Sequence, residues 1–237
     1  QQVIEHAEEM AEEDLSMGDI EDRFVQAEVI ESAAALAEKD LEMIQKADAE
    51  LAIVFKDASG ALLTASFPPG KLSFLVWPAL IPLLKSLENE SPSQAFRLGF
   101  LTGVSHYLTL IYWIVVVLGH YGNLSTLISL GPLILLCFYL ALYPAVFSSL
   151  IAYFKDSRFS VTLMASFWVG LEYLRANVLT GFPWCLLGYT QYEQLSLIQI
   201  SDLFGVYGLS FLIVLINGLL FTILFKRDGK SNAYFKW

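Results

Sequence analysis

The sequence predicts an all-α integral membrane protein with about six transmembrane helices, preceded by an acidic amphipathic N-terminal helical segment. Three observations lead to this fold class: a high apolar content, a charge bias confined to the N-terminus, and long apolar runs separated by short polar stretches. Of the 237 residues, 56% are hydrophobic and the mean hydropathy is +0.56, whereas soluble domains are about 45–50% apolar. We therefore expect two unlike parts, a polar extension over residues 1–50 and a polytopic membrane domain over residues 51–237.

The N-terminal extension carries most of the negative charge of the chain. Residues 1–50 hold 16 of the 24 acidic residues and only three basic ones, Arg23, Lys39 and Lys46. From Phe24 onwards apolar residues recur at helical spacing, which favours an amphipathic helix that packs on another surface. A solvated acidic helix or a partly disordered tail is the alternative. We expect no nucleic-acid partner for the chain.

The membrane domain is predicted from apolar runs near the length of about 20 residues that crosses a bilayer. The first predicted span is the weakest, because it reaches this length only by including Lys56 and Asp57. The second is short and contains Pro78 and Pro82, whereas the third is an uninterrupted apolar run. The six predicted spans cover approximately residues 51–67, 72–84, 100–118, 127–153, 159–174 and 206–225.

The basic residues are distributed over the loops in a way that indicates an orientation. If the N-terminus is cytoplasmic, the inner loops hold eight lysines and arginines, and the outer loops hold only Lys71 and Arg175. Cytoplasmic loops of membrane proteins carry such an excess of basic residues. We therefore expect both termini in the cytoplasm and the connection between the last two spans on the outer face.

An acid and a base stand at the end of the fifth predicted span, in a chain that otherwise keeps charge out of most of its apolar runs. Glu172 and Arg175 are three residues apart, so they share one face of a helix. Ionisable groups at membrane depth are costly and are by default functional candidates. The other interpretation is a structural ion pair, for which either single change to leucine should be tolerated less well than the double change.

The apolar loop after this span turns through Thr180–Trp184. Pro183 forces the turn, because it fixes φ and lacks an amide hydrogen. The amphipathic ring of Trp184 suits the membrane interface. An apolar loop on the outer face suits contact with a lipid or a lipidated substrate. The substrate- or lipid-facing candidates are Glu172, Arg175, Gly181, Phe182, Pro183 and Trp184.

Other polar residues in or near the spans are interpreted as structural. His106 has no accompanying His, Cys or Asp cluster, so a hydrogen-bonded role is favoured over a proton relay or a ligand. Asn217 is predicted to hydrogen-bond a neighbouring helix. Cys185 has no base beside it that would activate its thiol. The residue spacings predict no metal site, no cofactor and no catalytic residue.

Several short motifs resemble one known family. They are Ser66–Pro69 (SFPP), Ile111–Trp113 (IYW), Glu172–Arg175 (EYLR) with Leu179–Trp184 (LTGFPW) and Leu187–Tyr189 (LGY), and Gly205–Gly208 (GVYG). In this order they resemble the membrane part of apolipoprotein N-acyltransferases, over about residues 58–230. The TGFPW motif with its upstream Glu and Arg is the most specific of them.

The resemblance implies a transferase of the bacterial inner membrane. It would move an acyl chain from a membrane phospholipid to the N-terminal diacylglyceryl-cysteine of a lipoprotein. In that family the chemistry resides in a periplasmic nitrilase-like domain with a Glu-Lys-Cys triad. The sequence ends at Trp237, before this domain would begin, and neither Cys137 nor Cys185 lies in a matching motif. We therefore expect a truncated or fused product, inactive alone, with a nitrilase-like domain supplied in cis or in trans.

Two other functions remain open at this stage. One is a non-catalytic lipid- or protein-binding membrane module from a truncated or fused gene. The other is a small transporter, which six spans permit, although the sequence shows no inverted repeat and no paired interrupted helices.

Overall fold

The computed structural model describes residues 57–69, 72–155, 157 and 160–225. Within these residues the regular structure is helical and no strand occurs, which confirms the predicted all-α class. The predicted acidic segment over residues 1–50 lies outside the described residues. In chain order the helices are residues 57–65, η2 (Ser73–Val76), α3 (Ile81–Ser86), α4 (Pro92–Leu110), α5 (Trp113–His120), α6 (Thr126–Tyr153), α7 (Ser160–Asn177), η3 (Val178–Thr180), η4 (Leu187–Gln191), α8 (Leu195–Ile198) and α9 (Ser201–Phe225).

Two of the described helices are long and apolar enough to cross a membrane. They are α6, with 28 residues, and α9, with 25. The pair α4 and α5 is a third candidate if the two helices form one bent span. Length and composition thus give two or three spans in the described part of the chain, and the predicted count of six is not confirmed. Helix α7 covers the fifth predicted span, but it contains Glu172, Arg175 and Asn177 and is not among the candidates.

The third predicted span, over residues 100–118, is not one straight helix. Helix α4 ends at Leu110, α5 begins at Trp113, and the two are bent by 47°. Near the end of α4 the Thr109 hydroxyl lies 2.8 Å from the carbonyl oxygen of Ser105 and 2.9 Å from that of His106. Hydroxyls that bind carbonyls of the preceding turn bend helices. The span was predicted from hydropathy, which does not report such hydrogen bonds between a hydroxyl and the helix backbone.

The second predicted span, over residues 72–84, is divided between η2 and α3, which a turn connects. Pro78 lies in the turn and Pro82 in the first turn of α3, where a missing amide hydrogen costs least. The side chain of Asn217 on α9 satisfies this broken backbone. Its Oδ1 accepts from the Leu80 amide at 2.9 Å, and its Nδ2 donates to the Val76 carbonyl at 2.9 Å. The predicted role of Asn217 is therefore confirmed.

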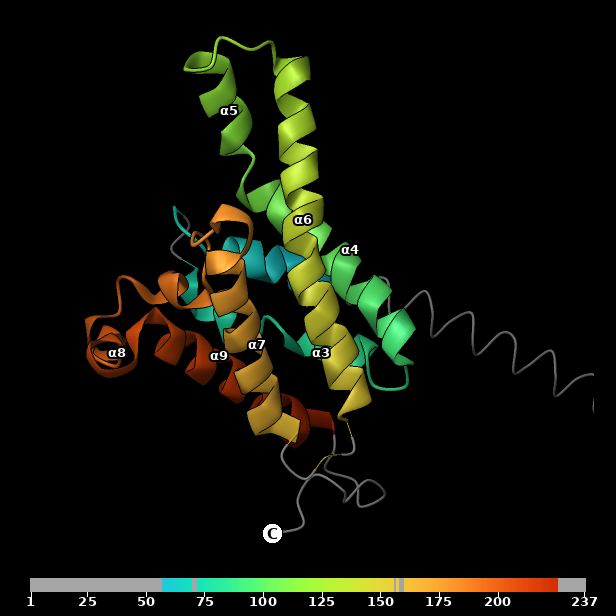
Figure 1. The fold of residues 1–237 in the computed structure, drawn as a ribbon. Helices are drawn as coiled ribbons and strands as arrows, with labels where there is room; N and C mark the ends of the chain where they lie inside the picture. The colour runs from blue at the N-terminus through green and yellow to red at the C-terminus, as the bar shows by residue number, and fades with distance from the viewer. Residues whose placement is uncertain (1–56, 70–71, 156, 158–159, 226–237) are drawn as a thin grey trace, which may run out of the picture. The chain divides into compact units, whose positions relative to one another are not determined.

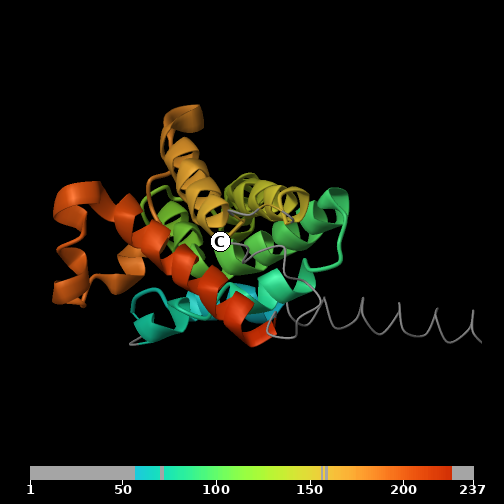
Figure 2. The same ribbon diagram turned by 90° about the horizontal axis from the view of Figure 1, so that it is seen from below.

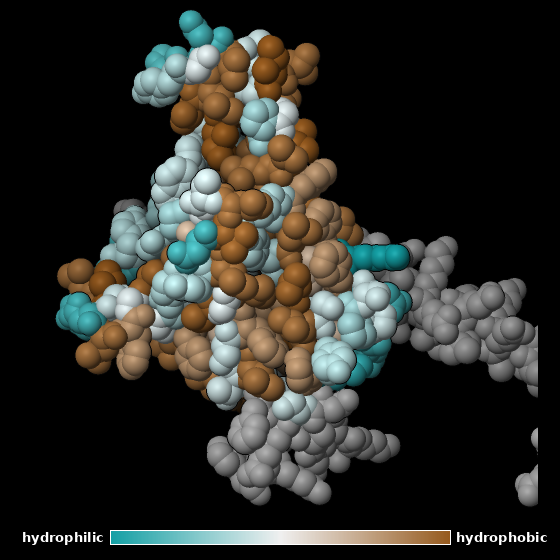
Figure 3. Space-filling model, in the orientation of Figure 1, coloured by the Kyte–Doolittle hydropathy of each residue, from teal (hydrophilic) through white to brown (hydrophobic). Residues whose placement is uncertain are grey.

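The long helices pack side by side around the short segments (Figure 1). Helix α4 packs along α6, and α7 packs on both α6 and α9. Seen from below, α9 runs across this group, close to α7 and α3 (Figure 2). At one end α5 and the first turns of α6 stand clear of the other helices, and Figure 3 shows that their surface is largely apolar. An apolar surface of this kind suits a lipid environment.

Glycines bring α4 and α6 into close contact. A Cβ atom on Gly99 would lie 2.4 Å from the carbonyl oxygen of Pro144, and one on Gly103 would lie 2.8 Å from the Cα of Ala141. Both glycines are buried, and they are four residues apart on one face of α4. Small residues at such positions let helix backbones approach, which is the main source of packing energy between membrane helices.

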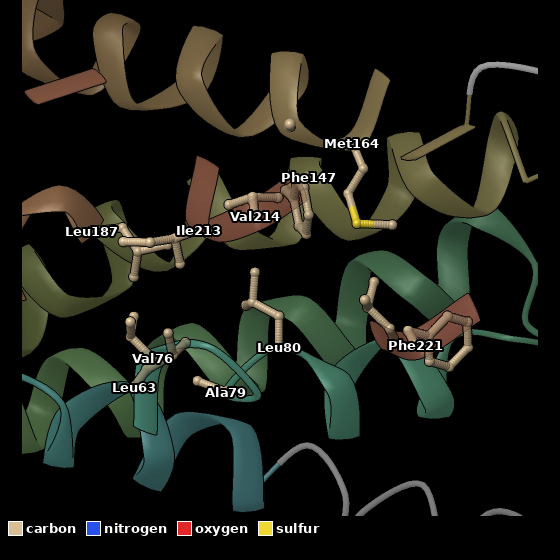
Figure 4. Packing of buried hydrophobic residues seen from close by; sticks show 12 residues of the cluster. Leu63, Val76, Ala79, Leu80, Phe147, Met164, Leu187, Ile213, Val214 and Phe221 are labelled. Carbon is tan, nitrogen blue, oxygen red and sulfur yellow. The ribbon is translucent and has the colours of Figure 1, made fainter. Parts of the chain in front are cut away.

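The main core lies where α6, α7, α9 and the short segments meet (Figure 4). It joins residues far apart in the chain, since Leu63, Leu80 and Ile213 belong to one buried cluster. The members labelled in Figure 4 are Leu63, Val76, Ala79, Leu80, Phe147, Met164, Leu187, Ile213, Val214 and Phe221. Leu187 belongs to the connection after α7, so this core also anchors the far end of the loop at Thr180–Trp184.

Candidate functional site

The connection between α7 and η4, which we call the 178–186 loop, has an unusual backbone. Leu179, Thr180 and Cys185 have positive φ angles of 51°, 72° and 59°. Such conformations are rare for residues other than glycine, and they cluster at functional sites. Gly181 has φ of 80°, and a Cβ there would lie 2.0 Å from the carbonyl oxygen of Ala176, so the position requires glycine. The predicted turn is therefore present and tightly constrained.

Arg175 holds this loop from inside the protein. Its side chain is only 3% exposed. The guanidinium donates to the Cys185 carbonyl at 3.0 Å, to the Trp184 carbonyl at 3.4 Å and to the hydroxyl of Tyr107 on α4. It also lies over the ring of Tyr107, 5.7 Å from the ring centre. One arginine thus ties two loop carbonyls to a neighbouring helix through its fork of donors.

Glu172 holds the other end of the same connection. It is 5% exposed, and its Oε1 accepts from the amide of Leu187 at 2.7 Å. The next amide, that of Gly188, donates to the hydroxyl of Ser210 on α9 at 2.9 Å. Irregular backbone at membrane depth is tolerated where it is buried in protein and its polar groups are satisfied. Side chains of α7 and α9 meet this requirement here.

Glu172 and Arg175 do not form an ion pair with each other. No nitrogen–oxygen distance between them is within 4 Å. Arg175 bonds carbonyl groups of the 178–186 loop, whereas Glu172 bonds the amide of Leu187, directly after the loop. The interpretation as a structural ion pair is therefore wrong. A spacing of three residues places two side chains on one face of a helix, but their extended ends bond the backbone groups within their own reach.

The remaining candidates lie on the loop itself. Phe182 is buried in one cluster with Tyr107, Ile111 and Leu133, and Gly181 is half-buried. Pro183 is exposed, and Trp184 is 56% exposed. The ring of Trp184 lies edge-on to Phe182 at 5.3 Å and to Trp113, the first residue of α5, at 5.9 Å. Three of the six candidates thus support the loop from inside, and two face outward.

Sequence reasoning missed the tyrosines that complete the site. Tyr107 binds Arg175, and Tyr139 on α6 donates to the Val178 carbonyl at 3.2 Å. In the sequence both look like ordinary aromatic residues of a membrane helix. His106 is buried and its Nδ1 lies 2.9 Å from the hydroxyl of Thr64, which fits the hydrogen-bonded role favoured above.

Cys185 is predicted to react slowly with alkylating agents at neutral pH. Burial raises the pKa of its thiol to about 11, from about 8.5 for a free cysteine. Because the thiolate is the nucleophile, the alkylation rate should rise roughly tenfold per pH unit from pH 7 to pH 10. We would measure it with maleimide after replacing the buried Cys137 by serine. An alkylation rate that levels off near pH 9 would contradict the raised pKa. The control is a Thr180→Cys variant that lacks both native cysteines and carries its thiol at an exposed position.

Within the described residues no group of three or more His, Cys, Asp or Glu side chains could hold a metal ion. The polar groups at the 178–186 loop instead hold backbone. The fold and the site therefore define a helical membrane domain whose buried charged side chains support an apolar loop.

Comparisons with known proteins place the chain in a family. A family model described as the apolipoprotein N-acyltransferase N-terminal domain matches residues 59–219. A protein of Geobacter metallireducens named apolipoprotein N-acyltransferase is 48% identical over 186 residues, 77% of this chain and 34% of that protein. Proteins with the same name from Photobacterium profundum and Haemophilus influenzae are each 33% identical over 73% of this chain, and 34% and 33% of those proteins are covered. The chain belongs to the apolipoprotein N-acyltransferase family.

The matched region holds the whole candidate site, from Tyr107 on α4 through the 178–186 loop to Ser210 on α9. The chain spans about a third of the length of the curated relatives that it matches. The resemblance stated from the motifs is thus confirmed for the family.

Proposed function

We propose that this chain is the membrane portion of an apolipoprotein N-acyltransferase. The reaction transfers an acyl chain from a membrane phospholipid to the N-terminal diacylglyceryl-cysteine of a bacterial lipoprotein. The observation that carries the proposal is the match of residues 59–219 to the family's N-terminal domain. The structure of the loop also supports the proposal. Arg175 and Glu172 form hydrogen bonds with backbone groups that fix an apolar turn, and this turn carries an exposed tryptophan.

In this proposal the 178–186 loop forms part of the wall along which lipid reaches the reaction centre. Pro183 and Trp184 offer an exposed apolar surface, and Trp113 extends it onto α5. Tryptophan suits this depth because its ring is apolar and its indole N–H is polar. The buried candidates Glu172, Arg175 and Phe182 fix the shape of this wall and are not expected to touch lipid.

The described residues position substrate in this proposal and do not carry the chemistry. Acyl transfer needs a nucleophile, a base and donors aimed at the developing oxyanion, all within hydrogen-bond reach. Burial keeps Cys185 as a neutral thiol. The neighbouring Arg175 donates hydrogen bonds to the Trp184 and Cys185 carbonyl groups and is not aimed at a developing oxyanion. We therefore assign the chemistry to a nitrilase-like domain in cis or in trans, as the resemblance implies.

The experiment is rescue of a strain depleted of its own N-acyltransferase. Residues 1–225 of this chain would replace the matched part of the Geobacter metallireducens relative, and mass spectrometry of lipoprotein N-termini would report acylation. We expect the fusion to restore N-acylation and this chain alone to leave it absent. A fusion that is present in the membrane but inactive, beside an active intact relative, would refute the proposal.

The fusion also tests Trp184. We expect Trp184→Ala to lower acyl transfer roughly tenfold while the amount of protein in the membrane changes little, because the lost ring is mostly exposed and contributes contact area to the lipid. Tyr192→Ala, which removes an exposed aromatic ring outside the loop, is the matched control. A fall in protein amount with unchanged specific activity would make Trp184 a purely structural residue.

We further propose a multi-pass location in the bacterial inner membrane with both termini in the cytoplasm. The charge distribution over the loops supports this orientation. Asn123 and Glu193 are exposed and lie in connections predicted to face outward. Cysteines placed singly at these positions should react with an impermeant reagent added outside spheroplasts. Reaction only after the membrane is opened would reverse the orientation.

A further inference from the structure

Three buried polar atoms on α7 have no hydrogen-bond partner among the residues that the structure describes. They are Nε1 of Trp168, Oε2 of Glu172 and Nε of Arg175. Steps of four and three residues place them on one face of the helix. Buried polar groups are nearly always bonded, so three such atoms on one face indicate a ligand.

All three side chains line one pocket between α4, α6 and α7. The rest of its wall includes Tyr107, Tyr143, Pro144 and Phe147, and its cavity volume is about 20 Å³, which is enough for a water molecule. Glu172 and Arg175 are each more than nine-tenths buried. Other atoms of the carboxylate and the guanidinium already bond the backbone around the loop. The three unbonded atoms are therefore available to a ligand in this pocket.

The donor and acceptor pattern restricts the chemistry of the ligand. The ring N–H of Trp168 and the Nε–H of Arg175 can only donate, and the free oxygen of Glu172 accepts when it is ionised. A ligand must therefore accept hydrogen bonds and donate at least one. Arg175 disfavours a cation and Glu172 disfavours an anion, because both charges lie in a poorly hydrated place. The ligand is then small, neutral and able both to donate and to accept.

We propose that this pocket is a hydration site, in which bound water links the Trp168 and Arg175 N–H groups to the free oxygen of Glu172. A buried water normally makes two to four hydrogen bonds, and the pocket offers three suitable atoms. Water between them also accounts for an acid and a base that are buried close together on one helix without pairing. The proposal is independent of the acyltransferase assignment.

The site makes Trp168 a positioning residue for the 178–186 loop. Water bonded to Trp168 fixes the Nε side of the Arg175 guanidinium, whose other nitrogens hold the carbonyls of Trp184 and Cys185. Trp168 itself does not bond the loop in the structure, and its ring packs edge-on against Phe147 at 4.9 Å. Removal of the Trp168 N–H should therefore alter the position of the loop only through the bound water and Arg175.

The direct test is magnetisation transfer from water to the tryptophan indole groups, measured by NMR on the intact chain in nanodiscs with deuterated lipid acyl chains. We expect the Trp168 indole N–H to show a dipolar cross-peak to water with the sign of a long-lived bound molecule. No transfer from water to Trp168 would contradict the proposal. Transfer only from lipid headgroup or glycerol protons would also overturn it and would make the ligand a lipid hydroxyl. The peak is assigned by Trp168→Phe or, if that variant does not fold, by replacing the other four tryptophans in turn.

The positioning role has its own readout. Trp168→Phe keeps the aromatic ring and removes the N–H, so we expect Cys185 alkylation to become roughly tenfold faster as Arg175 loosens its hold on the loop. Trp77→Phe, which changes a half-buried tryptophan elsewhere in the core, should leave the rate unchanged. Equal rates for the two variants would show that Trp168 does not position the loop.

Discussion

Arg175→Leu is expected to lower the free energy of unfolding by about 3 kcal/mol or more, since each buried acceptor that loses its donor costs about 1–3 kcal/mol. The change removes the donors for the Trp184 and Cys185 carbonyls and for the Tyr107 hydroxyl. The transition would be followed by circular dichroism during thermal unfolding in a mild detergent, where the midpoint should fall by several degrees.

Two variants show whether the loss comes from the geometry of Arg175. Arg175→Lys keeps the charge but cannot reach two carbonyls and a hydroxyl at once, so it should recover only part of the stability. Arg97→Leu removes an exposed arginine of α4 and should change stability by less than about 0.5 kcal/mol. If Arg175→Leu behaved like Arg97→Leu, the guanidinium would not hold the loop.

Gly103→Leu is expected to prevent α4 and α6 from packing and to abolish the folded state. A Cβ at Gly103 would already lie 2.8 Å from the Cα of Ala141 and 2.6 Å from Cγ of Pro144, and a backbone atom cannot move aside as a flexible side chain can. The protein should be recovered as aggregate, or elute as a broad peak on size exclusion.

A matched glycine tests whether position or residue type decides this outcome. Gly170 lies in α7, and a Cβ there meets no atom within 4 Å. Gly170→Leu should therefore fold, and the gain in helix propensity should raise its stability slightly. Comparable loss in both variants would show that the close approach of α4 and α6 is not the cause.

Residue patterns sufficed to predict the parts of this protein that depend on local composition. The run of apolar residues predicted a helix over 127–153, and α6 covers Thr126–Tyr153. Asn217 was predicted to bond a neighbouring helix, because an amide within an apolar span needs a partner. The turn at Thr180–Trp184 follows from Gly181 and Pro183, whose backbone preferences are local.

The patterns failed where the outcome depends on contacts across the fold. The bend between α4 and α5 involves hydroxyl groups that hydropathy treats only as slightly polar. Spacing places Glu172 and Arg175 on one face, but it does not indicate that loop carbonyls and an amide lie within their reach. Tyr107 and Trp168 become part of the site only through packing of α4, α6 and α7.

Glu172 and Arg175 support the two ends of the 178–186 loop separately, through Leu187 and Cys185, and do not act as an ion pair. The most direct test is to compare the thermal stability of Glu172→Leu, Arg175→Leu and the double variant in the same detergent. Two separate supports predict that the double variant is less stable than either single variant, because each change releases different backbone groups. A double variant that is more stable than both single variants would show that the two charges mainly compensate each other, and would contradict the account.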